Sequence, residues 1–398
     1  MDVRGNRLFF GEFAAEELAA RYGTPLYVYE TSTIARRYAE LVQHIPYRPL
    51  RIHYACKANS NLEILRLVHQ LGAGAETVSP GEIRLALAAG FAPHEILFTC
   101  SNIGRAELVY VLEQGVMVHL DSLGQIRHAG ELAPGLRVSL RINQGIGAGH
   151  HRHVITGGPE SKFGIPVELL PDALALAGRY GLKVVGIHQH IGSNVLDAAI
   201  LLEAMDAQLR TAASIAGLEF IDLGGGLGIP YRPEEKPLDL PALGKQMCEC
   251  FARFCETYGR PLEMILEPGR YLVAEAGTLL ATVTDIKRTP HRSFVGIDSG
   301  LNHLIRPALY GAYHEIVNAS RVEGDREVAC VAGNICESGD LFAHDRLLPR
   351  FQEGDILALL KVGAYGYAMS SNYNARPRPA EVLVDGHDVR LIRERESI

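Results

Sequence analysis

The stretch Arg51-Ile-His-Tyr-Ala-Cys-Lys57-Ala-Asn-Ser-Asn61 contains a short apolar run that ends at a lysine. Residues 51–56 are rich in strand-forming side chains, so the run predicts a buried strand with Lys57 at its carboxyl end. A lysine that emerges from a protein core is partly desolvated, which lowers the pKa of its ammonium group and leaves a nucleophilic amine. A strand-end lysine can equally extend its charge into water. This stretch alone leaves both interpretations open.

The same pattern of strand followed by helix-length segment recurs along the chain between about residues 30 and 270. The predicted strands are Ile52–Cys56, Gly74–Val78, Ile96–Thr99, Met117–Leu120, Arg137–Ile142, Val184–His190, Phe220–Leu223 and Met264–Leu266. Amphipathic helices are expected between them, for example over Gly81–Ala89 and Val167–Tyr180. Eight such units predict an α/β fold with a closed (β/α)8 TIM barrel, and a doubly wound open sheet is the alternative.

After Gly269 the pattern changes to strands separated by turns, without intervening helices. The predicted strands here are Val273–Thr284, Phe294–Asp298, Glu327–Ala332, Ile356–Leu360 and Glu381–Val384. This pattern predicts a second, all-β domain. We therefore expect a barrel domain over residues 30–270 and a β domain formed by residues 1–29 together with 271–398.

Composition narrows the class of protein. The 398 residues exceed one typical core, and 47% hydrophobic with 21% charged residues is ordinary for a soluble globular protein. A net charge of −7 argues against a nucleic-acid partner, and no apolar stretch reaches membrane-spanning length. The start, Met1-Asp-Val-Arg-Gly-Asn, lacks the order of a signal peptide, so we expect a cytoplasmic location.

Two groups of potential metal ligands carry little weight. Cys248, Cys250 and Cys255 lie on a predicted helix, without the paired Cys-x-x-Cys spacing of a zinc site. His150, His151 and His153 lie in the run Gly149-His-His-Arg-His153, where adjacent histidines cannot easily share a tetrahedral site. We expect a basic loop there and no metal.

Polar residues lie near the carboxyl ends of the predicted barrel strands. They are Lys57, Glu76, Ser101, Asn102, Asp121, Arg141, Asn143, His190, Asp222 and Glu267. Because reactive groups of such barrels gather at the carboxyl ends of the strands, these positions predict one site.

Two motifs near the end of the barrel suggest how that site binds a ligand. In Asp222-Leu-Gly-Gly-Gly-Leu-Gly228, the amides of Gly224, Gly225 and Gly226 could approach a phosphate, although a tight turn also needs glycine. In Glu267-Pro-Gly-Arg270, the carboxylate could keep a heteroaromatic nitrogen protonated, as pyridoxal phosphate chemistry requires. A Glu267–Arg270 ion pair is the alternative.

Other candidate residues lie in three further motifs. In His188-Gln-His190-Ile-Gly-Ser-Asn194, His190 could stack on a flat ring and Ser193 could bind a phosphate, or His190 could be structural. In Cys336-Glu337-Ser-Gly-Asp340, a thiol that could deliver a proton lies beside two acids.

Arg306-Pro-Ala-Leu-Tyr310 offers a guanidinium that matches a carboxylate. Tyr365 and Tyr373 add phenols that could reach a phosphate or a substrate.

Together these segments resemble the barrel-type (fold type III) pyridoxal phosphate decarboxylases of basic amino acids. The resemblance runs from Tyr54-Ala-Cys-Lys57-Ala-Asn to Asn372-Tyr-Asn-Ala-Arg-Pro-Arg-Pro379 and is closest to the diaminopimelate branch. It implies pyridoxal 5'-phosphate as cofactor, a barrel with a β domain, and a homodimer whose active sites are shared between subunits.

The resemblance also implies a role for each candidate in the barrel. Lys57 looks like the lysine that holds the cofactor covalently, and His190 like the histidine that stacks on its ring. Ser193 and Gly224 to Gly226 match the phosphate cradle, Glu267 matches the partner of the ring nitrogen, and Arg270 matches an arginine near the phosphate and the substrate carboxylate.

For the β domain, the resemblance implies residues that complete the site. Arg306 and Tyr310 match the clamp on the distal carboxylate of the substrate, and Tyr373 matches a tyrosine near cofactor and substrate. Tyr365, reaching the phosphate, is expected from the other subunit. Cys336, the proton donor, and Glu337, which reads the far amino group, are also expected across the dimer.

The implied reaction is decarboxylation of meso-diaminopimelate at its D-centre to L-lysine and CO2, the last step of lysine biosynthesis. Glu337 stands where related ornithine decarboxylases carry Asp, and the Arg306–Tyr310 pair suits a carboxylate at the far end of the substrate. One departure is Gly333-Asn-Ile-Cys336, where the family often has Gly-Pro. Alternatives are a decarboxylase of ornithine, lysine, carboxynorspermidine or a carrier-tethered amino acid, and a catalytically silent regulatory homologue.

Overall fold

A computed structural model describes residues 1–149, 156–158 and 160–397. The chain divides into two compact units. The barrel unit comprises Tyr38–Pro230 and Lys236–Tyr271, and the β unit comprises Met1–Arg37, Tyr231–Glu235 and Leu272–Ile398. The short segment Tyr231–Glu235 is thus flanked on both sides by barrel sequence but packs in the β unit.

Eight parallel strands form a closed sheet in the barrel unit. They are β5 (Leu50–Ala55), β6 (Gly74–Thr77), β7 (Ile96–Thr99), β8 (Met117–Leu120), β9 (Arg137–Asn143), β12 (Lys183–His188), β14 (Phe220–Asp222) and β15 (Glu263–Leu266). Each strand pairs with the next in this order, and β15 pairs with β5, which closes the ring. The predicted TIM barrel is confirmed, and the open sheet is excluded.

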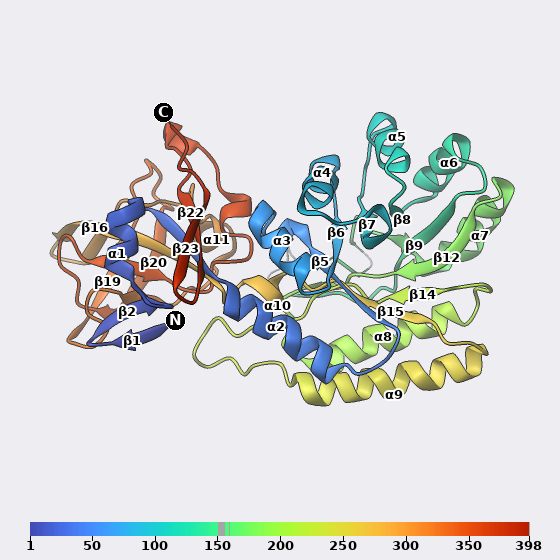
Figure 1. Cartoon of the computed structure of the whole chain (residues 1–398), viewed down its shortest axis with the longest axis horizontal. Coiled ribbons are helices and arrows are strands. Elements are labelled where there is room, and N and C mark those ends of the chain that lie inside the picture. The colour runs from blue at the N-terminus through green and yellow to red at the C-terminus, as the bar shows by residue number, and fades with distance from the viewer. Residues whose placement is uncertain (150–155, 159, 398) are drawn as a thin grey trace. The chain divides into compact units, whose positions relative to one another are not determined.

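Helices cover the outside of the barrel strands (Figure 1). They are α3 (Leu62–Gln70), α4 (Pro80–Ala89), α5 (Arg105–Glu113), α6 (Leu123–Leu132), α7 (Leu170–Arg179), α8 (Ala198–Ala212) and α9 (Leu240–Tyr258). Their ends follow local chemistry. In α4 the Ser79 side chain accepts a hydrogen bond from the Glu82 amide, Pro80 occupies the first turn, and Gly90 ends the helix with φ +107°.

Several predicted boundaries near the site were wrong by a few residues. Strand β5 ends at Ala55 because Cys56–Ala58 form a 3-10 turn that carries Lys57. Strand β12 ends at His188, two residues before His190. Two helices, α2 (Thr31–His44) and α10 (Arg270–Val273), include residues of both units. The strand predicted from Val273 begins only at Gly277, since α10 precedes it.

The β unit is built on a mixed sheet in the order β20-β19-β17-β16-β4-β22-β23, with β21 paired to both β16 and β18. Its strands are β4 (Leu26–Glu30), β16 (Gly277–Arg288), β17 (Ser293–Ile297), β18 (Ile316–Asn318), β19 (Arg326–Ala332), β20 (Leu341–Pro349), β21 (Ile356–Leu359), β22 (Ala380–Asp385) and β23 (Asp388–Arg393). Pairs β4–β22 and β17–β19 are parallel, whereas the other pairs are antiparallel.

The N-terminal segment contributes a small sheet and two elements of the core. Strands β1 (Asp2–Arg4), β2 (Arg7–Phe10) and β3 (Phe13–Ala14) pair with one another, and α1 (Ala15–Tyr22) follows. An apolar core joins Leu18 of α1 to residues of β4, β16, β21 and β22. The prediction of no helices after Gly269 was wrong at two points, first at α10 and again between β17 and β18. Helix α11 (Arg306–Tyr310) forms there because Pro307 suits its first turn and Gly311 ends it with φ +60°.

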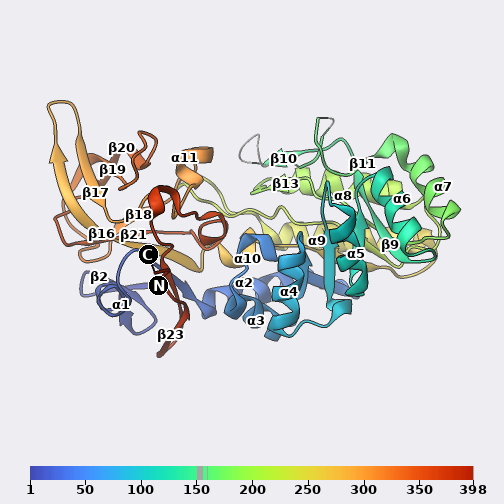
Figure 2. The same ribbon diagram turned by 90° about the horizontal axis from the view of Figure 1, so that it is seen from above.

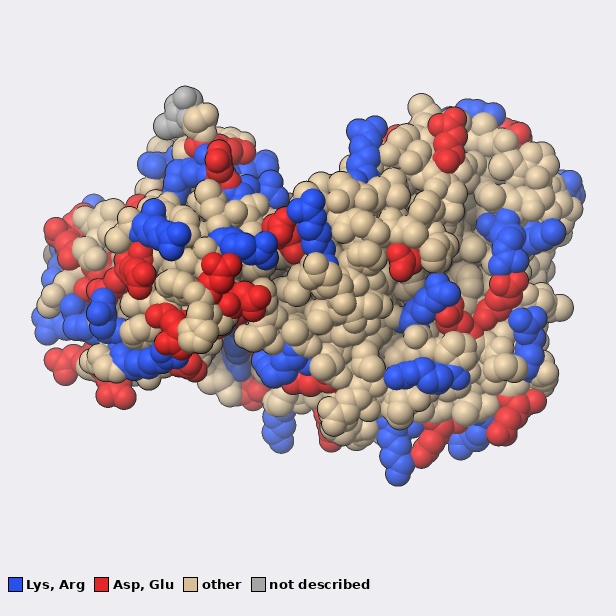
Figure 3. All heavy atoms as spheres, viewed as in Figure 1, with Lys and Arg blue, Asp and Glu red and all other residues tan. Residues whose placement is uncertain are grey.

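Charged side chains are mixed in sign on the face drawn in Figure 3. Among the residues that the structure describes, no helix combines the length and apolarity needed to span a bilayer.

Candidate active site

Lys57 forms an ion pair with a carboxylate at the end of the neighbouring strand. Its Nζ donates to Glu76 Oε2, and the two side chains are 31% and 2% exposed. The pKa of Glu76 is raised because its carboxyl is buried, while the Lys57 charge acts in the opposite direction. Glu76, to which the sequence assigned no role, therefore orients the predicted nucleophile.

Glu267 lies directly after β15 and is buried. Its Oε2 is 3.0 Å from His188 Nε2. Burial lowers the pKa of His188 well below its usual value, so the neutral ring donates this hydrogen bond. The other oxygen, Oε1, is buried without a hydrogen-bond partner among the described residues. A buried acceptor of this kind is costly unless a ligand donates to it. The protonated ring nitrogen of pyridoxal phosphate fits that requirement.

His188 is a residue that the sequence analysis missed, because the histidine two positions later took the predicted role. His188 is the last residue of β12, and its ring lies against that of His119, with centroids 4.6 Å apart and planes tilted by 30°. A sequence signal was nevertheless available, because His188 lies at the carboxyl end of a predicted barrel strand, where reactive groups gather.

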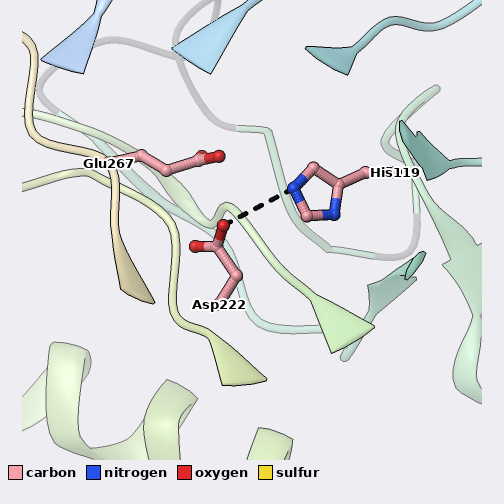
Figure 4. Close-up of side chains that lie close together, drawn as sticks. All are labelled: His119, Asp222 and Glu267. Atoms are coloured by element: carbon pink, nitrogen blue, oxygen red, sulfur yellow. Dashed lines mark ion pairs between the residues drawn. The ribbon is translucent and has the colours of Figure 1, made fainter. Parts of the chain in front are cut away.

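His119, Asp222 and Glu267 point toward one another inside the barrel (Figure 4). His119 Nε2 lies 3.6 Å from Asp222 Oδ2. Burial, and then the nearby Glu267 charge, raise the pKa of Asp222 well above its usual value. Burial likewise lowers the pKa of His119. One ligand atom from each of the three residues lies within 4.8 Å of the others, so the group has the residue types of a metal site.

The glycine triplet allows two backbone segments to approach each other closely. A Cβ on Gly224 would lie 2.1 Å from the Gln189 carbonyl oxygen, and one on Gly225 would lie 2.3 Å from that of Glu267. The amides of these two glycines donate to Asp222 Oδ1 at 2.8 Å and to His190 Nδ1 at 3.2 Å. Backbone packing therefore explains glycine at positions 224 and 225, and both amides have protein acceptors, while the phosphate cradle of Gly224 to Gly226 stays a prediction.

The described contacts that suit a phosphate come from Ser193 and Arg270. Arg270 is buried, and its Nε and Nη2 donate to Ser193 Oγ at 3.2 and 3.0 Å. Ser193 is held by β13 (Gly192–Ser193), which pairs in parallel with β10 (Ala148–Gly149) and lies beside it in Figure 2. A guanidinium and a hydroxyl are strong phosphate ligands, so the residues present fit the cofactor.

The β-unit candidates divide into a buried and an exposed group. Arg306, the first residue of α11, is 1% exposed, and its Nη1 lies 2.9 Å from His314 Nε2. Tyr310, at the other end of α11, is half-buried. Tyr365 is half-buried with φ +58°, whereas Tyr373 is exposed.

Cys336 and Glu337 are exposed in the loop between β19 and β20. Asp340 is buried and accepts hydrogen bonds from the amides of Leu301 at 2.6 Å and Ile335 at 2.7 Å. It therefore anchors the loop, which corrects its grouping with the two chemical candidates. The Cys336 amide donates to Asn374 Oδ1 at 2.7 Å.

Two further predictions concern cysteines and histidines. Each of the seven cysteines is free, and Cys248, Cys250 and Cys255 lie on α9 as expected for a helix. His150, His151 and His153 lie outside the described residues.

Comparison with known proteins agrees with this geometry. Residues 31–274 match the family model "Pyridoxal-dependent decarboxylase, pyridoxal binding domain". Diaminopimelate decarboxylase of Methanothermobacter thermautotrophicus is 47% identical, over 98% of this chain and 93% of the relative. That of Aquifex aeolicus is 38% identical, over 100% and 95%.

Solved structures give the same result. The diaminopimelate decarboxylase of M. jannaschii in complex with L-lysine matches with a TM-score of 0.92 at 36% identity, covering 100% of this chain and 95% of that one. A lysine/ornithine decarboxylase from Vibrio vulnificus shares the fold at 19% identity, with a TM-score of 0.81 over 93% of this chain and 98% of that one. The chain therefore belongs to the diaminopimelate decarboxylases, within the family of pyridoxal-dependent decarboxylases.

Proposed function

We propose that this chain converts meso-diaminopimelate to L-lysine and CO2 by decarboxylation at the D-centre, as the last step of lysine biosynthesis. The observation that carries the proposal is Glu267, with one buried oxygen bound by His188 and the other without a partner among the described residues. Pyridoxal phosphate, when bound, supplies the electron sink for the bond that breaks.

Lys57 would hold the cofactor covalently through Nζ, with Glu76 orienting that amine. Ser193 and Arg270 would bind the phosphate, and His190 would stack on the ring. Glu267 Oε1 would accept the hydrogen bond of the ring nitrogen and so keep the ring positively charged, which favours loss of CO2.

The β-unit residues would bind and protonate the substrate. Arg306 and Tyr310 bind its distal carboxylate, Glu337 binds its distal amino group, and Tyr365 and Tyr373 complete the phosphate and substrate contacts. When the carbon–carbon bond breaks and CO2 leaves, the same carbon takes a proton from Cys336 Sγ, which regains one from water. The other chiral centre is untouched, so the product is L-lysine.

The first test is lysine release from meso-diaminopimelate by the purified, cofactor-loaded protein, with ornithine, lysine and carboxynorspermidine as parallel substrates. We expect lysine from meso-diaminopimelate and no CO2 from the others. Lys57→Ala should abolish turnover, whereas Lys245→Ala, at a side chain 77% exposed on α9, should not. CO2 from a different amine would overturn the substrate assignment and leave the role of Lys57 intact.

We also infer a homodimer in which Cys336 and Glu337 of one subunit, with Tyr365, serve the barrel of the other. Cys336 and Glu337 are exposed in the β unit, which supports this arrangement. Mixing inactive Lys57→Ala and Cys336→Ser proteins should then restore about a quarter of wild-type activity, because half of the dimers would contain one intact site of two. No restoration after subunit exchange would refute shared sites. We place the enzyme in the cytoplasm, where its free thiols stay reduced.

A further inference from the structure

We propose that Tyr231 and His314 are positioning residues that fix the guanidinium of Arg306, and that they thereby set the preference for a ligand with a distal carboxylate. The inference rests on the proposed role of Arg306 as the distal-carboxylate clamp. All three residues lie in the β unit. Neither Tyr231 nor His314 was a candidate in the sequence.

The guanidinium of Arg306 has fixed contacts on one face and on one edge. Its Cζ lies 4.8 Å from the centroid of the Tyr231 ring, within the range of a cation–π contact. Its Nη1 lies 2.9 Å from His314 Nε2. Since the side chain is almost fully buried, these contacts replace water that a charged group would otherwise keep.

The tautomer of His314 follows from its second contact. Its Nδ1 lies 2.9 Å from the Leu360 carbonyl oxygen, which can only accept a hydrogen bond, so Nδ1 carries the hydrogen. Nε2 of the neutral ring is then an acceptor for Arg306 Nη1. The ring also meets that of Tyr231 edge to face, with centroids 5.5 Å apart and planes at 82°. The three side chains therefore interlock.

Tyr231 is itself held by a local turn. Glu235 Oε2 accepts hydrogen bonds from the amides of Tyr231 at 2.7 Å and Arg232 at 3.1 Å. This turn belongs to the five-residue segment Tyr231–Glu235 that leaves the barrel sequence and packs in the β unit. This segment thus places the Tyr231 ring against Arg306 of α11.

A guanidinium fixed in this way suits recognition of a carboxylate. Carboxylates bind arginine through two parallel hydrogen bonds in the guanidinium plane, so the orientation of that plane decides affinity. Because Tyr231 and His314 restrain the plane before a ligand arrives, less conformational freedom is lost on binding. L-lysine carries the distal carboxylate, whereas cadaverine is the same diamine without it. This pair of ligands isolates the contribution of Arg306.

The test measures dissociation constants of L-lysine and cadaverine for the cofactor-loaded enzyme by calorimetry. We expect Tyr231→Leu and His314→Leu each to weaken L-lysine binding about ten-fold and to change cadaverine binding less than about two-fold. The KM for meso-diaminopimelate should rise by a similar factor while kcat changes little. Tyr231→Phe, which keeps the ring, should retain wild-type selectivity.

Tyr110→Leu is the matched control. It removes an aromatic ring of α5 that packs against a different guanidinium, that of Arg84 at 5.0 Å, so selectivity should not change. Unchanged L-lysine binding in Tyr231→Leu, or equal weakening of both ligands, would overturn the inference. A wild-type enzyme that does not prefer L-lysine to cadaverine would instead overturn the proposed role of Arg306. If His314→Leu fails to fold, the Tyr231 pair still decides between these outcomes.

Discussion

Replacing Lys57 by Met should make the stability of the protein depend on pH through one buried carboxylate. Methionine keeps most of the alkyl stem of lysine and removes only its charge, so little cavity forms. Glu76, which is 2% exposed, then loses the cation with which it is paired. The perturbation therefore isolates the cost of an uncompensated buried carboxylate.

The magnitude follows from the burial of the two partners. Breaking a fully buried ion pair costs about 3–5 kcal/mol, but the Lys57 side chain is 31% exposed and partly screened by water. We therefore expect a loss of about 1–3 kcal/mol at pH 8. The sign with pH is fixed by the raised pKa of Glu76 in the folded protein, which the loss of Lys57 raises further. As pH rises above the pKa that Glu76 has in the unfolded chain, the unfolded chain releases this proton first. The free energy of unfolding therefore falls as pH rises. The loss is therefore small near pH 5 and grows toward pH 8.

Urea unfolding of the cofactor-free proteins at pH 5.5, 7 and 8.5 measures this effect. Circular dichroism is the appropriate probe because the chain contains no tryptophan. The double variant Lys57→Met/Glu76→Gln has no titrating carboxyl at this position, so its stability relative to wild type should lose the added pH dependence. A loss in Lys57→Met that is equal at all three pH values, or that persists in the double variant, would refute the reasoning.

Three further predictions concern other parts of the structure. Gly225→Ala should lower stability by about 1–3 kcal/mol in a melting experiment and reduce cofactor retention after dialysis, because the added Cβ would meet a backbone oxygen. Gly178→Ala, at a helical glycine with open space around it, should be neutral or stabilising in the same experiment. Burial lowers the pKa of His53 to about 4. As pH falls from 7 to 4 the unfolded chain binds a proton first, so the free energy of unfolding of wild type should fall by up to about 3 kcal/mol through this group. His53→Leu should remove that part of the pH dependence. Cys336→Ser should lower kcat by about 10²-fold or more and leave cofactor absorbance unchanged, and an unchanged kcat would exclude this thiol as the proton donor.

The barrel could be predicted because its strands are locally marked. Ile96–Thr99 and Met117–Leu120 form strands over the residues expected, since each is a short apolar run bounded by turns. Strand β4 was missed although all five of its residues are buried, because its partners β16 and β22 are about 250 and 350 residues away in sequence. Strand β23 was missed because it is an edge strand whose residues are mostly exposed, so it has no apolar pattern that marks it in the sequence.

The site was predictable where function follows strand ends, and less so where it depends on tertiary contacts. The positions of Lys57, Glu76 and Glu267 near the ends of β5, β6 and β15 could be inferred from the repeated alternation of strands and helices in the sequence. The contact of His314 with Arg306 could not, because its second hydrogen bond goes to a carbonyl 46 residues away. Likewise, no local pattern indicates that Tyr231 leaves the barrel sequence.

The chain passes between the two units four times, after Arg37, Pro230, Glu235 and Tyr271. Neither unit is therefore a continuous gene fragment. Exchange of only the C-terminal portion of the gene would separate Arg306 from Tyr231. Exchange of only the barrel portion would replace Tyr231 while keeping Arg306. The proposed link between Tyr231 and Arg306 therefore predicts that chimaeras intended to alter substrate preference should carry residues 231–235 together with the C-terminal half.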